Sequence, residues 1–209
     1  MLCTKCGHAV EEGAAICPAC GAEAGTMVQK MPAIAVAEAT GQEVEEPAEL
    51  VQRQEALHQY VEMISGRLLQ KPQFIPDLRS YMFKTDRMTM ALAKLHQYFF
   101  ITQNDGADYE SMRQFTEACV AYVLDTYKGL PRGLQKGLGI YPVMCQYAAD
   151  PQAIAFAQRK PDNHFAAFEL PVVVEMCSGR LYYMQKTPVW GFAMWKGIKR
   201  IAENTLSIK

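Results

Sequence analysis

Two matching cysteine motifs near the N-terminus constrain this chain more than any other feature. They read Cys3-Thr4-Lys5-Cys6-Gly7 and Cys17-Pro18-Ala19-Cys20-Gly21. Two residues between the thiols let one tight turn aim both sulfurs at one ion, and the glycine lets the backbone fold back so that amide N–H groups point at the sulfurs. Two such turns supply the four thiolates that Zn²⁺ prefers in closed structural sites. We therefore predict one structural Zn²⁺, with no open position for catalysis, bound by Cys3, Cys6, Cys17 and Cys20.

The opening residues also resemble a known family. The segment MLCTKCGHAVEEGAAICPACGAE is similar to the short, rubredoxin-like zinc ribbon found at the N-terminus of many prokaryotic proteins. Those ribbons carry a glycine turn and a hydrophobic residue before the second cysteine pair, and Glu12-Gly13-Ala14 and Ile16 stand at these places. The resemblance covers residues 1–23 and implies metal binding. It implies nothing about catalysis, because the family is attached to many unrelated domains.

The ribbon is followed by a segment of linker composition. Residues 24–47 are rich in Ala, Glu, Gly, Thr and Pro and contain no aromatic residue. Between residues 22 and 50, six glutamates stand against Lys30 alone, so the acidic charge of the chain is concentrated here. Such a composition does not build a packed core. We expect three parts: a ribbon over 1–23, a flexible acidic linker over 24–47 and a folded domain over 48–209.

The cysteines and the hydropathy pattern bear on the compartment. No apolar run approaches the roughly 20 residues that span a membrane. A cysteine pair stands where the apolar region of a signal peptide would lie. Paired cysteines that bind metal rather than forming disulfides fit a reducing compartment. We expect a cytoplasmic protein with no membrane partner.

The first half of the large domain shows helical periodicity. Residues 48–70 repeat apolar side chains at spacings of three and four, which predicts a helix that Pro72 ends. A second helix is predicted over 85–103, with Met88, Leu92, Leu95 and Phe99 on one stripe. A third helix is predicted after Asp108, its N-cap residue.

The second half changes to a strand pattern. Residues 140–145 read as a strand, and Pro142 favours an edge position or an irregular start. Asp150-Pro151 opens a short helix. Residues 165–176 form a β-prone run whose centre, Val172-Val173-Val174, is apolar on both faces. A hairpin turn follows at Cys177-Ser178-Gly179-Arg180, and residues 181–184 form the returning strand. A helix over 192–206 closes the chain. The predicted fold class is α+β, with helices first and then a small mixed sheet in β-α-β-β-α order.

Two acids and a lysine on or beside the predicted hairpin offer one catalytic hypothesis. Glu169, Glu175 and Lys186 are similar to the arrangement in metal-dependent nucleases of the restriction-endonuclease type. That site uses an acid-x-Lys triplet to hold Mg²⁺ and a water. The triplet here, Met184-Gln185-Lys186, lacks the acid. Ordinary solvent-facing strand residues are the competing interpretation.

Two other patterns carry chemistry less specifically. A glycine-rich basic loop contains Gly129, Arg132, Gly133, Lys136, Gly137 and Gly139. It lacks the P-loop motif and precedes a strand rather than a helix, so a flexible connection is favoured over a phosphate site. His164 and Cys177 form a conceivable nucleophile pair. Because Cys119, Cys145 and Cys177 all stand in apolar runs, we expect buried, inert thiols instead.

The last predicted helix carries three cations. Lys196, Lys199 and Arg200 lie on one side, with Trp190 and Trp195 nearby, a combination that can contact nucleic acid by phosphate pairing and stacking. A solvated face opposite the apolar stripe is the favoured interpretation. The aromatic residues of 181–195 either fill the core or line an interface.

These observations leave three functional hypotheses. The first is a non-enzymatic zinc-binding protein whose α+β domain binds a protein partner or self-associates. The second is a nuclease-like hydrolase with its site within 140–186. The third is a nucleic-acid accessory factor. The sequence identifies no catalytic residue and no cofactor-binding residue apart from the zinc ligands. The lack of clustered His, Asp and Glu favours the first hypothesis.

Overall fold

The computed structural model describes residues 2–3, 27–28, 48–88, 94–127, 136–161, 167–187 and 192–208. Its contacts divide the chain into two units, Met1–Glu45 and Glu46–Lys209. In the first unit, β1 (Leu2–Cys3) pairs antiparallel with β2 (Met27–Val28), which places Cys3 opposite Met27. The other three predicted zinc ligands, Cys6, Cys17 and Cys20, lie outside the described residues.

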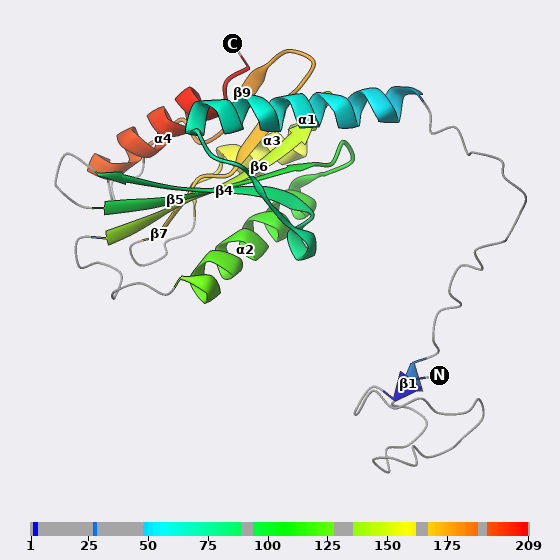
Figure 1. Ribbon diagram of the computed structural model, residues 1–209, viewed down its shortest axis with the longest axis horizontal. Coiled ribbons are helices and arrows are strands. Elements are labelled where there is room, and N and C mark those ends of the chain that lie inside the picture. The colour runs from blue at the N-terminus through cyan, green and yellow to red at the C-terminus, as the bar shows by residue number, and fades with distance from the viewer. Residues whose placement is uncertain are drawn as a thin grey trace, which may run out of the picture. The chain divides into compact units, whose positions relative to one another are not determined.

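The second unit is built on one mixed sheet (Figure 1). Its strands are β3 (Gln73–Ile75), β4 (Ser80–Met88), β5 (Lys94–Gln103), β6 (Lys136–Gln146), β7 (Ala167–Glu169), β8 (Val172–Glu175) and β9 (Arg180–Tyr182). They are ordered β3-β4-β5-β6-β8-β9. β7 also pairs with β6, at residues that precede those paired with β8. β5, β6, β7 and β8 pair in parallel, whereas the β3–β4, β4–β5 and β8–β9 pairs are antiparallel.

Helices cover both faces of the sheet. They are α1 (Ala48–Leu68), α2 (Tyr109–Thr126), α3 (Pro151–Gln158) and α4 (Phe192–Leu206), with a short 3-10 helix, η2 (Pro76–Leu78), after β3. Figure 1 shows α1 and α4 on one side of the sheet and α2 on the other. The core clusters agree, because α1 and α4 share one buried cluster with the sheet, whereas α2 and α3 contribute to the clusters on the opposite face. The expected mixture of helices and a mixed sheet is confirmed.

The predicted helix over 85–103 is wrong. These residues complete β4 and form β5, which pair antiparallel with Met88 opposite Lys94. Leu95 and Phe99 pack toward α1, while Tyr98 and Phe100 pack toward α2, so β5 is apolar on both faces. The sheet therefore begins before α2, and the predicted order of helices first and strands afterwards is also wrong.

The sequence suggested an edge strand at Pro142, and this prediction is wrong. It lies in β6, which has β5 on one side and β7 and β8 on the other. The Ile140 carbonyl accepts the Leu170 N–H at 2.8 Å, so the next donor from β6 toward this neighbour would be residue 142. Proline has no N–H, and the neighbouring strand is interrupted at this point between β7 and β8. A proline is thus tolerated in a central strand because the ladder is broken opposite it.

The predicted continuous run over 165–176 is wrong, because β7 and β8 are two separate strands, but the other elements predicted for the second half are present. Residues 136–146 form a strand, 151–158 a helix, and 192–206 a helix. β6 and β8 pair in parallel, and β9 returns antiparallel to β8. The β8 residues Val172, Val173 and Val174 are fully buried, with helices covering both faces.

Candidate binding pocket at the carboxyl edge of the sheet

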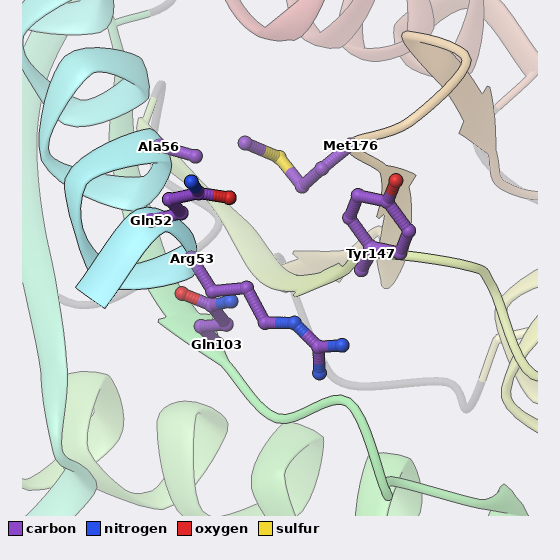
Figure 2. Close-up of a pocket in the computed structure, with 6 residues that line it drawn as sticks. All are labelled: Gln52, Arg53, Ala56, Gln103, Tyr147 and Met176. Carbon is purple, nitrogen blue, oxygen red and sulfur yellow. The ribbon is translucent and has the colours of Figure 1, made fainter. Parts of the chain in front are cut away.

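The carboxyl ends of β5, β6 and β8 meet at one edge of the sheet, which we call the carboxyl edge. In α/β folds this edge is where ligands bind, because the loops after parallel strands converge there. A pocket of about 270 Å³ opens at this edge, beside the first half of α1. Figure 2 shows the six side chains that line it: Gln52, Arg53, Ala56, Gln103, Tyr147 and Met176.

One carboxylate organises the wall of the pocket. Asp105, in the loop after β5, accepts a bond from Arg53 Nη1 of α1 through Oδ2 at 3.1 Å. Through Oδ1 it accepts the backbone N–H of Tyr147, which follows β6, at 2.5 Å. The Arg53 guanidinium lies over the Tyr147 ring, 5.4 Å from its centroid, a cation–π geometry. A single residue thus connects α1, β5 and β6 around the pocket.

Tyr147 is held by its backbone while its side chain stays exposed. The Tyr147 carbonyl accepts the Cys177 N–H at 3.0 Å, so the backbone is fixed from both neighbouring strands. The side chain is nevertheless 54% exposed. Tyr109, at the start of α2 on the same edge, is 39% exposed and packs edge-on against Phe156 at 5.2 Å. Two partly exposed aromatic side chains therefore lie at this edge.

The helix N-termini at the carboxyl edge are already capped. Asp108 accepts the Ser111 N–H at 2.9 Å at the start of α2. Asp150 accepts the N–H groups of Gln152 and Ala153 at 2.7 and 3.2 Å at the start of α3. The bonds from Ser111 lower the pKa of Asp108, so this cap is ionised at neutral pH. Since each helix dipole already faces a carboxylate, neither N-terminus offers a phosphate site.

Polar side chains behind the pocket hydrogen-bond to the backbone of the surrounding loops. The Gln146 amide, which is fully buried, donates to the carbonyls of Asn104 and Ala107 and accepts the Asp150 N–H. Glu175 accepts bonds from the Ser178 hydroxyl, the Ala149 N–H and the Tyr182 hydroxyl, and these bonds lower its pKa. These side chains hold the loops after β5, β6 and β8 in place.

The described residues do not assemble the predicted nuclease site. Glu169 and Glu175 stand opposite Ile140 and Gln146 of β6, six positions apart. At about 3.3 Å per residue they are separated by about 20 Å, too far to share a metal ion. Glu169 is buried beside Arg159, whose Nη2 lies 3.5 Å from its carboxylate. Lys186 is exposed beyond β9.

The structure describes some of the other predicted nucleophiles and loop residues. Cys119 and Cys145 are buried, as expected, and burial raises the pKa of both thiols, which disfavours the reactive thiolate. Cys177 is exposed in the turn after β8, so the expectation that it is buried is wrong. His164 lies outside the described residues, as do Gly129, Arg132 and Gly133. Gly137 and Gly139 belong to β6 rather than to a phosphate-binding loop.

The cations and aromatic residues of the C-terminal segment are largely structural. Lys199 donates to the Gln185 carbonyl and the Thr187 hydroxyl, both at 2.8 Å. Trp195 is fully buried against Phe168, and Trp190 lies outside the described residues. Burial and a hydrogen bond to Glu203 raise the pKa of Tyr183 to about 12. The aromatic side chains that are described here therefore fill the core, and Lys196 and Arg200 remain the exposed cations of the predicted patch.

Comparison with known proteins finds a family match at the N-terminus. Residues 2–24 match the model of the zinc-ribbon domain family, which indicates zinc binding by this segment. No curated protein and no solved structure matches the chain. Within the described ranges, no cluster of three or more His, Cys, Asp or Glu side chains could hold a metal.

No helix among the described residues is long and apolar enough to cross a bilayer.

Sequence reasoning did not find the pocket. Its lining comes from α1 and from residues at or just beyond the ends of β5, β6 and β8. Because residues 85–103 were predicted as a helix, the position of Gln103 at the end of a strand was not expected. The turn signal Asn104-Asp105-Gly106 was the available clue, because residues after parallel strands gather at one edge.

Proposed function

We propose that this protein is a non-enzymatic zinc-ribbon protein whose second unit binds a protein partner through the carboxyl edge. The ribbon holds one structural Zn²⁺ through Cys3, Cys6, Cys17 and Cys20. Four thiolates fill the coordination shell of the ion, so the metal stabilises the ribbon and leaves no site for a substrate.

The composition of the pocket supports a binding role. Its lining includes Tyr147, Arg53 and Met176, three residue types that are enriched in protein interfaces. Tyrosine and arginine are also the residues that most often carry binding energy there. The single observation that carries the proposal is that Tyr147 is fixed by its backbone yet 54% exposed. A tyrosine on a fixed backbone has only two side-chain torsions to order, so it loses little conformational entropy on binding.

The acids of the same edge support a non-catalytic role. Asp108 and Asp150 cap helices, Asp105 pairs with Arg53, and Glu175 accepts three bonds. A general base needs a free lone pair in reach of a substrate proton. Carboxylates that make these bonds stabilise helix ends and loops.

Site-directed photocrosslinking in the producing cells tests the proposal. A benzoylphenylalanine at position 147 should give a discrete covalent adduct with a second protein. The matched control is position 74, because Phe74 is 51% exposed but lies in β3, an edge strand separated from β6 by β4 and β5. Discrete adducts at 147 and none at 74 support the proposal. No adduct at 147, or the same adducts at both positions, contradicts it.

A further inference from the structure

The size of the carboxyl-edge pocket limits what it can hold. Pockets for drug-sized ligands and cofactors enclose about 300–1,000 Å³. This one encloses about 270 Å³ and is partly open. It is too small for a dinucleotide or a similar cofactor, and it is large enough for one amino-acid side chain with its adjoining backbone.

The walls of the pocket differ on its two sides. The Ala56 methyl, the Met176 thioether and the Tyr147 ring give apolar surface, and methionine adapts its shape to what it contacts. Gln52 and Gln103 contribute side-chain amides, which point toward the same space from α1 and β5 (Figure 2). An amide offers both donors and an acceptor, so the pair can bond the N–H and C=O groups of an extended peptide.

Charge distinguishes between the ligands that fit. The carboxylates of Asp105, Asp150 and Glu175 stand in the loops or at the strand ends around the pocket, and Arg53 and Arg180 are the cations beside them. Asp108 adds a further carboxylate at the start of α2. The four carboxylates outnumber the two guanidinium groups, a balance that favours a positively charged segment over a phosphate.

We propose that the pocket binds one uncharged, apolar side chain, from an aliphatic residue or proline, within an extended and positively charged segment of the partner protein. The apolar side chain packs against Ala56, Met176 and Tyr147. The partner backbone bonds to the amides of Gln52 and Gln103, and flanking Lys or Arg residues face the carboxylates of the edge. This inference deepens the proposed function and rests on it.

Selection of random peptides on the full chain tests the inference. The probe is a phage-displayed library of random 12-residue peptides, and selected sequences are then synthesised and measured by fluorescence polarisation. The inference predicts a shared aliphatic residue or proline with Lys or Arg beside it. An acidic consensus, or no enrichment above the unselected library, overturns it.

Two pocket variants and one control locate the binding. Ala56→Phe fills the pocket, and Tyr147→Ala removes an exposed ring, so neither change disturbs the buried core. Each should weaken the selected peptide by at least about tenfold, as loss of a central contact does. Phe74→Ala, at a site of similar exposure, should leave the affinity unchanged. Equal binding to all variants overturns the inference. If crosslinking at position 147 succeeds while the peptides ignore both pocket variants, the proposed function stands and only the pocket inference fails.

Discussion

Leu69 combines two unfavourable features at the end of α1. It adopts a left-handed backbone conformation, with φ of 53°, and its side chain is 90% exposed. The Gln70 N–H bonds to the Ser65 carbonyl at 3.2 Å, the pattern that closes a helix around a left-handed residue. Glycine usually occupies this position, since a Cβ atom is costly there.

Replacing Leu69 with glycine should therefore stabilise the second unit. We expect the free energy of unfolding to rise by about 0.5–1 kcal/mol, because relief of the left-handed strain exceeds the extra chain entropy of glycine. The measurement is chemical denaturation of the full chain. Leu69→Ala is the control, since it removes the side chain but keeps Cβ, and it should leave stability within about 0.5 kcal/mol of the parent. Equal effects from both substitutions would mean that the exposed side chain, not the backbone, matters.

Glu175 makes a pH-dependent contribution at the carboxyl edge. Bonds from the Ser178 hydroxyl and the Ala149 N–H lower its pKa in the folded state. A carboxylate with a lowered folded pKa stabilises the fold fully above its unfolded pKa of about 4.3 and loses that contribution as the pH falls through the folded value. Glu175→Gln should therefore be destabilising at neutral pH and lose less stability on acidification. Unfolding curves recorded between neutral pH and pH 3 test this, and identical acid profiles for the two proteins would refute it.

At the scale of elements, the sequence correctly predicted the helices and strands whose apolar residues follow a clear pattern. α1, α2, α3 and α4 lie close to their predicted ranges, as does the hairpin of β8 and β9. Residues 85–103 misled because Leu95 and Phe99 are four positions apart, and a spacing of four fits one face of a strand as well as one face of a helix. β5 is buried on both faces, which removes the alternation that identifies a strand.

The candidate site was beyond prediction for a related reason. Gln52 and Gln103 are about 50 positions apart and become neighbours only through the pairing of β5 with β6 and the packing of α1. Of the residues singled out from the sequence, Glu175 and Cys177 lie beside the pocket. They hold the neighbouring loops by hydrogen bonds to Ala149 and Tyr147, rather than serving as a metal ligand and a nucleophile.

A charge in β8 tests the assignment of this strand to the interior of the sheet. Val173 is fully buried between β6 and β9 and packs toward α3. Val173→Asp should cost several kcal/mol, since it buries an unpaired charge, and domains of this size have only about 5–15 kcal/mol of stability in total. The variant should be insoluble or unfolded by circular dichroism. Gln185→Asp, at an exposed position after β9, should melt like the parent. A folded Val173→Asp protein would show that β8 is misplaced.

At the scale of the whole molecule, the two units should respond separately to proteolysis. α1 begins at Ala48, and the predicted acidic linker ends at residue 47. Limited proteolysis should cut first between Ala24 and Pro47 and leave a stable fragment that begins near residue 48. Mass spectrometry of the early fragments provides the measurement. First cuts within 48–209 would contradict the predicted division of the chain.

The most direct test of the account measures zinc and domain stability in the same protein. Elemental analysis should find one zinc per chain, and X-ray absorption should find sulfur ligands only. Cys17→Ser should lose the metal, whereas Cys177→Ser, at an exposed cysteine outside the ribbon, should keep it. Chelation should leave the melting of residues 48–209 nearly unchanged, because the metal stabilises only the segment that binds it. A zinc-free protein, or full zinc occupancy in Cys17→Ser, would contradict the account.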